Sequence, residues 1–314
     1  MPELTYADSR QRYFVRILRE LCQEEGWAVS FFSQDWIARL SDAHSVHWVY
    51  GYQFDLNSVT AQMLALDKAA TYTLLTDAGL AAVAHQLFVQ PEATGWVSEE
   101  GVWESLHAYA RAHRFRVVAK PNRGTRGQEV YFVQNPRDLE AAAHRLWQLD
   151  RSFCLSPWLE IATEYRLLVL DDAILLAYAK DIPMLIADGQ QTHQALFAAA
   201  QHPIPTHLNP KEIPNRGTLI PVLQKNNLSG GAKPRLLTNI PHQLQSLVLK
   251  AAHTIGIRFA SVDVIQTSDG EQMVLEINSG LLGRSFIEQA PDGYAIAKMV
   301  YRQVLRKVFE EGKN

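Results

Sequence analysis

The segment 261–278 constrains the fold most, because it reads as two strands joined by an Asp269-Gly270 turn. Both central positions of a two-residue hairpin turn need positive φ, which these residue types tolerate. Counting outward from that turn places Asp263 directly opposite Glu276, with Cβ atoms about 5 Å apart. Asn278 follows two residues later and projects from the same face. The sequence therefore predicts an antiparallel hairpin with three oxygen-bearing side chains on one face.

Apolar residues occupy the other face of this hairpin, as a core requires: Val262, Val264, Leu275 and Ile277. Two opposed carboxylates repel each other unless a cation lies between them. Two carboxylates and an amide suit Mg²⁺ or Mn²⁺ better than zinc. The set Asp263, Glu276 and Asn278 is then either a metal site or a solvated sheet face with an incidental like-charge pair. A shift of one residue in the strand register would remove the metal site.

A second candidate site follows the apolar strand that ends at Lys120. The loop after it contains Gly124, Thr125 and Gly127, and glycines let backbone N–H groups approach phosphate oxygens. The loop joins two strands, and the chain has neither GxxxxGK[ST] nor a GxGxxG opening a helix. P-loop and Rossmann nucleotide sites are therefore excluded. The segment is either a phosphate-binding loop or an ordinary glycine-rich hairpin loop.

Composition excludes several classes of protein. The 314 residues suggest two or three lobes, and 47% apolar with 20% charged residues are typical of a folded chain. The formal net charge of −3 argues against nucleic-acid binding. Cys22 and Cys154 are too few for a disulfide scaffold or a zinc site. We expect no membrane span and a cytoplasmic location, because there is neither an N-terminal signal segment nor a long apolar run.

The chain reads as alternating helices and strands. Helices are expected at about 9–25, 58–78, 136–149, 241–255 and 292–309. Strands are expected at 28–32, 47–50, 115–120, 129–133, 165–170 and 174–179, besides the acidic hairpin. The first third predicts a small layered α/β lobe that ends near residue 90. Residues 202–221 contain five of the 14 prolines and predict a long surface loop of the kind that covers binding sites.

Other side chains have two interpretations each. Glu164 and Arg166 share a strand face, as site residues or as a surface ion pair. Lys68 begins a helix, where most lysines are solvated. No pair among the 11 histidines has metal-ligand spacing, so His193 and the others receive no role.

In order, the motifs resemble the ATP-grasp carboxylate–amine ligases, above all the ATP-grasp domain of cyanophycin synthetases and bifunctional glutathione synthetases. The matching segments span about residues 60–305. They are Asp67-Lys68-Ala69-Ala70-Thr71, Val117–Pro121 with its glycine loop, Glu164–Leu170, Ile182-Pro183 with Ala187-Asp188-Gly189, Asn227–Gly231, and the acidic hairpin. The resemblance implies an α/β chain of α+β subdomains with the ATP-grasp fold. An N-terminal α/β lobe would span 1–90, a small subdomain with the glycine-rich flap 91–160, and a large subdomain with the metal-binding hairpin 161–314.

The resemblance also implies roles for individual residues. Lys68, Lys120 and the loop 124–127 would contact the phosphates of ATP. The segment Ser156-Pro157-Trp158-Leu159 would contact adenine, Glu164 the ribose, and Asn227 would belong to the nucleotide site as well. The implied Mg²⁺ ligands are those that the hairpin count brings together. Arg166 and Lys180 would face the γ-phosphate and the reacting carboxylate. Arg284 would hold a substrate carboxylate or is an ordinary surface arginine.

The implied activity is a ligase that uses ATP and Mg²⁺, with Mn²⁺ as a substitute. It would activate the carboxylate of an amino acid or small peptide as an acyl phosphate and join it to an amine, releasing ADP and phosphate. The implied partners are small-molecule substrates, without nucleic acid or membrane, and a homodimer fits the resemblance. The alternatives are a ligase that adds glutamate to a protein or peptide tail, a phosphotransferase that stops at the acyl phosphate, and a catalytically silent ATP-binding regulator.

Overall fold

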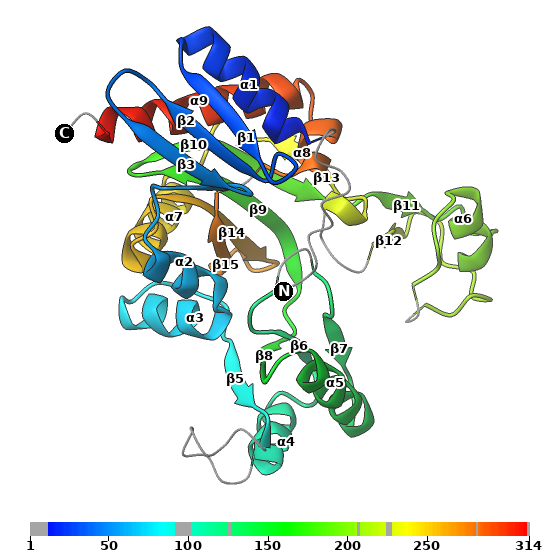
Figure 1. Ribbon diagram of the computed structural model, residues 1–314. Coiled ribbons are helices and arrows are strands. Elements are labelled where there is room, and N and C mark those ends of the chain that lie inside the picture. The colour runs from blue at the N-terminus through cyan, green and yellow to red at the C-terminus, as the bar shows by residue number, and fades with distance from the viewer. Residues whose placement is uncertain are drawn as a thin grey trace.

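Four sheets and the helices that cover them make up the described part of the chain (Figure 1). The computed structural model describes residues 12–91, 102–124, 127–205, 208–223, 228–280 and 282–312. Every pairing between named strands in those ranges is antiparallel. The positions Thr125, Asn227 and residues 1–11 lie outside the described ranges.

The N-terminal part is an amphipathic helix on an antiparallel sheet. The helix α1 (Tyr13–Glu25) ends at Gly26, whose φ of 75° gives the left-handed cap expected of glycine. The sheet has the order β1 (Ala28–Phe32), β2 (Ile37–Ser41), β3 (Val46–Tyr50) and β4 (Gln53–Phe54). The sequence prediction of alternating β and α units was wrong here, because β2 was missed. Left-handed residues at 33–35 reverse the chain in a tight turn, so no crossover helix is needed.

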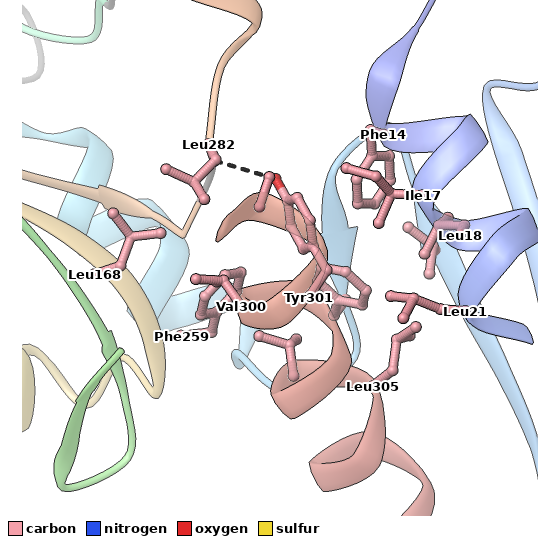
Figure 2. Close-up of a cluster of buried hydrophobic side chains, with 14 of the residues drawn as sticks. Phe14, Ile17, Leu18, Leu21, Leu168, Phe259, Leu282, Val300, Tyr301 and Leu305 are labelled. Carbon is pink, nitrogen blue, oxygen red and sulfur yellow. Dashed lines mark hydrogen bonds between the residues drawn. The ribbon is translucent and has the colours of Figure 1, made fainter. Parts of the chain in front are cut away.

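The largest core joins the two ends of the chain (Figure 2). Side chains of α1 such as Ile17 and Leu21 pack against Tyr301 and Leu305 of α9 (Gly293–Glu311). Tyr301 is fully buried, and its hydroxyl accepts a hydrogen bond from the backbone N–H of Leu282 at 3.1 Å. The N-terminal sheet, α1 and α9 therefore share one hydrophobic core.

The central sheet has the order β13-β10-β9-β14-β15. Its strands are β13 (Lys233–Leu236), β10 (Ala173–Asp181), β9 (Ile161–Leu170), β14 (Phe259–Thr267) and β15 (Gln272–Ser279). One face contributes Leu168, Leu170 and Phe259 to the core shared with α9. The other face contributes Leu167, Val169 and Val262 to a second core. The helix α7 (His242–Ile255) covers this second face, and α8 (Arg284–Gln289) precedes α9.

In the acidic hairpin, Asp263 pairs with Glu276 as predicted, but this pairing depends on a bulge that the count from the turn did not include. Only Gly270 has positive φ at its tip, so the predicted two-residue Asp269-Gly270 turn was wrong. Near the turn, Val264 pairs with Val274, which is one residue out of the predicted register. Leu275 is then the extra residue of a bulge, and it restores the pairing of Asp263 with Glu276. Val274 takes the buried place expected for Leu275.

The helix expected over 58–78 is two helices. Ser58 caps α2 (Val59–Leu66), and Asp67 caps α3 (Lys68–Asp77) with its side chain. Asp67 has extended backbone angles, so it ends one helix and starts the next. Both helices contribute to the second core with α7. The break matters because it makes Lys68 the first residue of α3.

A smaller sheet has the order β5-β8-β6-β7 and lies beside the central sheet (Figure 1). Its strands are β5 (Gln86–Val89), β8 (Ser152–Pro157), β6 (Val117–Pro121) and β7 (Tyr131–Val133). The helices α4 (Val102–Ala112) and α5 (Pro136–Leu149) pack on one face around Phe88, Val117 and Phe153. Asn135 caps α5 and Pro136 opens it, as predicted.

A short arm projects from the central sheet (Figure 1). It contains the paired strands β11 (Met184–Ile186) and β12 (Leu219–Pro221) and the helix α6 (His193–Ala199). The long loop expected over 202–221 therefore ends in a strand, and Ile220 belongs to a small core with Ala187 and Phe197. The turn Leu228–Gly230 is a 3₁₀ helix. No helix in the described part of the chain is long and apolar enough to span a membrane.

Candidate active site

Strand alternation brings charged side chains together on the central sheet. On β9, Leu168 and Leu170 face the core. Because side chains alternate along a strand, Arg166 and Glu164, which lie nearer the start of β9, project from the same face. Arg166 pairs in register with Asp263 of β14. Asp263 in turn pairs with Glu276 of β15. The same face of one sheet therefore changes from hydrophobic core to a row of charges.

Asp263 is the centre of a buried ion-pair network. Its side chain is 1% exposed, and Arg166 donates to both of its oxygens, Nε to Oδ1 and Nη2 to Oδ2, at 2.6 Å each. Lys180 of β10 donates from Nζ to Oδ2 of Asp263 at 2.9 Å and also to Oε1 of Glu164. Lys180 and Glu164 are themselves buried. The sequence-predicted residues Glu164, Arg166, Lys180 and Asp263 thus form one contact group, the charged network.

The network fixes the ionisation of its members. Burial alone would raise the pKa of Asp263, but Arg166 and then Lys180 outweigh it and hold this pKa well below its usual value. Burial raises the pKa of Glu164, against the opposing effect of Lys180. Burial would lower the pKa of Lys180, but the two carboxylates raise it, so its ammonium form is favoured. Asp263 is therefore the firmly ionised carboxylate of the network.

Lys68, Glu276 and Asn278 lie next to this network on α3 and β15. The Nζ of Lys68 is 3.8 Å from Oε2 of Glu276 and donates to the carbonyl oxygen of Gly124 at 2.8 Å. Asn278 donates from Nδ2 to Oε1 of Glu276 at 3.2 Å, which leaves the carbonyl oxygen of the Asn278 amide for another partner. The side chain of Glu276 is 21% exposed, unlike that of Asp263. The helix start, the glycine loop and the acidic hairpin therefore meet at one place.

Lys120 is a buried cation, and no acidic side chain in the described ranges forms an ion pair with it. It lies on β6 and is 9% exposed. Its ammonium makes no hydrogen bond or ion pair with any residue that the structure describes. Burial lowers the pKa of Lys120, and the charge of Lys68 lowers it further, whereas Glu276 and Glu164 oppose this. The smaller sheet therefore presents an unpaired ammonium close to the carboxylates of the central sheet.

The other predicted nucleotide residues have mixed placements. Gly127 has a left-handed φ of 63° in the loop after Lys120. Ser156 is buried on β8, and its neighbour Trp158 donates its backbone N–H to the carbonyl of Arg116 at 2.9 Å. Leu159 follows and is half-buried.

Arg284, the predicted contact for a substrate carboxylate, is the first residue of α8. Its side chain is 61% exposed and pairs with Glu288 at 2.7 Å.

Sequence reasoning missed two residues at this site. Asn122 is 2% exposed, accepts from the backbone N–H of Ala69 through Oδ1, and accepts from that of Lys68 through its carbonyl. It therefore attaches the glycine loop to the start of α3. His85, just before β5, is 4% exposed. Their only sequence signals are positions beside Lys120-Pro121 and beside a strand, so neither could be found without the fold.

The donor set was compared with what a metal ion requires. In the ranges that the structure describes, no group of three or more His, Cys, Asp or Glu side chains could hold a metal ion. Asp263 and Glu276 are nevertheless directly opposed, and the third oxygen in the row belongs to an amide, Asn278. Two carboxylate groups and one amide carbonyl are donors of the kind that Mg²⁺ takes. The residues present fit a hard cation that keeps part of its water shell.

Neither a protein-family model nor a curated protein matches the sequence. Among solved structures, a bifunctional glutathione synthetase from Pasteurella multocida is similar, with a TM-score of 0.53 and 17% identity over 92% of this chain and 43% of that chain. A D-alanine–D-alanine ligase from Bacillus anthracis is similar with a TM-score of 0.52 and 14% identity, over 81% and 72% of the two chains.

This chain spans less than half the length of that glutathione synthetase. At these identities the similarity concerns the fold. It confirms the fold that the order of sequence motifs predicts, with subdomains of helices and antiparallel sheet. The chain has the ATP-grasp fold.

Proposed function

We propose that this protein is an ATP-dependent carboxylate–amine ligase that forms an amide bond and releases ADP and phosphate. The observation that carries the proposal is the unpaired, buried ammonium of Lys120 beside Lys68 and the charged network. Leaving a buried cation unpaired is costly, so a bound anion is its natural partner. In an ATP-grasp fold, an anion at this position fits the phosphates of ATP.

The charge balance of the site supports a polyanionic substrate. Four cations (Lys68, Lys120, Arg166 and Lys180) face three carboxylates (Glu164, Asp263 and Glu276), which leaves an excess of one positive charge. Asp263, Glu276 and Asn278 would hold Mg²⁺. When bound, that ion would neutralise phosphate charge and polarise the transferring phosphoryl group. With Mg²⁺ bound to Glu276 and Asp263, Lys68 and Lys180 would be free to turn from these carboxylates toward phosphate oxygens.

The reaction needs no nucleophilic side chain. A carboxylate oxygen of the acid attacks the γ-phosphorus of ATP, and the bond from that phosphorus to the bridging oxygen of ADP breaks. The amine nitrogen then attacks the acyl carbon of the acyl phosphate, the C–O bond to phosphate breaks, and the nitrogen loses a proton to water. Lys68 and Lys120 would bind the phosphates, while Arg166 and Lys180 would stabilise charge on the transferred group. These roles require positioning and charge, which the site offers.

The acid is proposed to be an amino acid or a small peptide. The exposed Arg284 beside the end of the acidic hairpin is the proposed contact for a second substrate carboxylate. The glycine loop, through Gly124 and Gly127, and the segment with Ser156, Trp158 and Leu159 are proposed to border the nucleotide. Glu164 is proposed to accept hydrogen bonds from the ribose hydroxyls, which requires that its present contact with Lys180 is broken first.

The test is release of ADP and phosphate from ATP and Mg²⁺ with pooled amino acids and dipeptides. The matched variant is Glu276→Gln, which removes a carboxylate charge at a partly exposed position and keeps the side-chain shape. We expect release that depends on the pool and is lost in the variant. Release of AMP and pyrophosphate would contradict the proposed chemistry. ADP release without an amine would indicate a phosphotransferase, whereas ATP binding without release would indicate a peptide-tail acceptor or a regulator.

A further inference from the structure

His85 is a buried histidine that the proposed reaction does not use. It is 4% exposed, and its Nε2 is buried without a hydrogen-bond partner among the residues that the structure describes. The ring does have a backbone partner, the carbonyl of Val83. Because Nε2 has no partner, that contact is made through Nδ1, which must donate to the carbonyl oxygen. We therefore assign the proton of neutral His85 to Nδ1, which makes Nε2 a bare acceptor.

The strand register places His85 on the ligand side of the smaller sheet. Leu87 of β5 pairs with Cys154 of β8, and Cys154 pairs with Lys120 of β6, so these three side chains share one face. That face is opposite to the one that packs on α4 and α5 through Phe88 and Phe153. His85 precedes Leu87 by two residues, and the charges of Lys120 and then Lys68 act on its ring. An acceptor without a donor and an ammonium without an anion therefore lie near each other.

The charge state of the ring is fixed by its surroundings. Burial lowers the pKa of His85 well below its usual value, and Lys120 and Lys68 lower it further. The ring is therefore neutral at physiological pH, and Nε2 keeps its lone pair. A buried acceptor left unpaired is destabilising, so a ligand that donates to it gains affinity.

We propose that His85 is a specificity-determining residue that recognises the 6-amino group of the adenine base through Nε2. The inference rests on the proposed function, because it takes a purine nucleotide as the ligand. The edge of adenine presents an acceptor at N7 beside a donor at N6, whereas a 6-oxo purine presents acceptors at both places. Lys120 and His85 offer the complementary pair, a donor and an acceptor. Lys120 has three N–H donors, so a contact with N7 leaves two for phosphate oxygens.

The proposal gives Ser156 a consistent place. The strands β5 and β8 are antiparallel, and their register ends with Gln86 opposite Leu155. Extended by one residue, that register sets His85, which precedes Gln86, opposite Ser156, which follows Leu155. Ser156 is in the segment proposed to border the base, and its short side chain reaches less far than an amide or carboxylate. The base-reading acceptor would then come from the neighbouring strand rather than from β8 itself.

The experiment compares the binding of ADP and of IDP, which differ in the 6-amino and 6-oxo groups, by titration calorimetry in the presence of Mg²⁺. The full chain is expected to prefer ADP by about 10- to 100-fold, the range that one satisfied buried acceptor supports. His85→Leu should reduce the preference to less than about threefold, mainly by weakening ADP binding. His85→Gln retains a side-chain acceptor and should keep part of the preference. His253→Leu, on an exposed side chain of α7, is the matched control and should change nothing.

The outcomes separate this inference from the proposed function. Tight ADP binding with equal affinity for IDP would overturn the role of His85 and leave the ligase proposal standing. A preference that persists in folded His85→Leu would do the same, and it would point to a buried water as the partner of Nε2. No binding of ADP to the folded wild-type chain would overturn both. If His85→Leu fails to fold, the wild-type ratio and the His85→Gln ratio still decide.

Discussion

Lys120 separates binding from stability more sharply than any other residue of the site. Its ammonium is buried without a hydrogen-bond or ion-pair partner in the described ranges, so the cost of burying the charge outweighs the attraction of Glu276 and Glu164 until an anion binds. Replacing a catalytic cation normally risks confusing a loss of structure with a loss of function. At Lys120 the two effects are expected to have opposite signs.

We expect Lys120→Met to weaken ATP binding by about 10- to 100-fold, the loss of one charge-assisted hydrogen bond. The free energy of unfolding should stay equal or rise, because methionine fills the volume without the desolvation of a charge. Titration calorimetry and urea unfolding measure the two quantities. Lys250→Met, on an exposed side chain of α7, is the control. Unchanged nucleotide affinity in Lys120→Met would remove its phosphate role.

Asp263 and Glu276 are equivalent in the sequence pattern but not in the folded molecule. The sequence suggests that either carboxylate can be removed without loss of the fold. Asp263, however, holds Arg166 and Lys180 in the interior, whereas Glu276 is partly exposed and 3.8 Å from its cation. Activity lost in an Asp263 variant is therefore ambiguous, and Glu276 is the better position at which to test the metal.

Asp263→Ala is expected to lower the free energy of unfolding by about 3–5 kcal/mol, because it leaves the buried Lys180 and the half-buried Arg166 without this carboxylate. Glu276→Gln should cost less than about 1 kcal/mol. Urea unfolding of both variants is the measurement, with Glu271→Ala as an exposed control on the same hairpin. Equal losses at Asp263 and Glu276 would contradict the network described for Asp263.

At the scale of elements, the acidic hairpin illustrates what sequence reasoning can and cannot supply. Alternation and a turn signal were enough to predict two strands and the opposed carboxylates. The turn type and the bulge at Leu275 were not predicted, and they happen to compensate in register. A bulge is decided by how the strand packs against its neighbours, here through Val274 and Ile277 in the second core, and a single sequence does not contain that information.

Capping residues in the sequence did predict where two of the helices begin or end. Gly26 ends α1 and Asn135 caps α5, as expected. The resemblance named the members of the charged network, but their contacts could not be predicted from the sequence. Lys180 and Asp263, for example, are 83 positions apart in the chain. The same is true of His85, since its neighbours Lys120 and Lys68 come from other elements.

The contact between α1 and α9 makes a prediction about pH. Lys298 of α9 donates to Glu20 of α1 at 2.8 Å, and this contact chiefly, with Arg16 and Tyr294, lowers the pKa of Glu20 to about 2. The folded value lies below the usual 4.5. The stabilisation is therefore complete above pH 4.5 and is lost as the pH falls toward 2.

We expect the urea midpoint of the wild-type chain to fall between pH 5 and pH 3 more than that of Glu20→Gln, which has no carboxylate to protonate. At pH 7 the variant should be the less stable of the two. Asp77→Asn, whose side chain is exposed at the end of α3, controls for a general effect of removing charge. Parallel pH curves for wild type and Glu20→Gln would contradict the helix contact.

At the scale of the whole molecule, the largest core joins residues 14–56 to residues 168–309. Trp27 stacks on Phe309 with ring centroids 4.2 Å apart, and Phe14 contacts Tyr301. Leu168 and Phe259 of this core (Figure 2) lie on the face of the central sheet that carries the charged network farther along. The N-terminal segment therefore supports the strands that position the site, although it supplies none of the proposed site residues.

Removal of residues 1–56 should accordingly unfold the rest of the chain. The truncation exposes the surfaces of Tyr301, Leu305 and Phe309, and each buried side chain of this kind contributes about 1.5–3 kcal/mol. For these three side chains the loss is about 4.5–9 kcal/mol, which is comparable with the about 5–15 kcal/mol that stabilises a typical domain. Circular dichroism and urea unfolding of 57–314 should show no cooperative transition, against a single transition for the full chain. A truncated chain that unfolds cooperatively and still binds ATP would show that the central and smaller sheets fold and assemble the site without the N-terminal sheet.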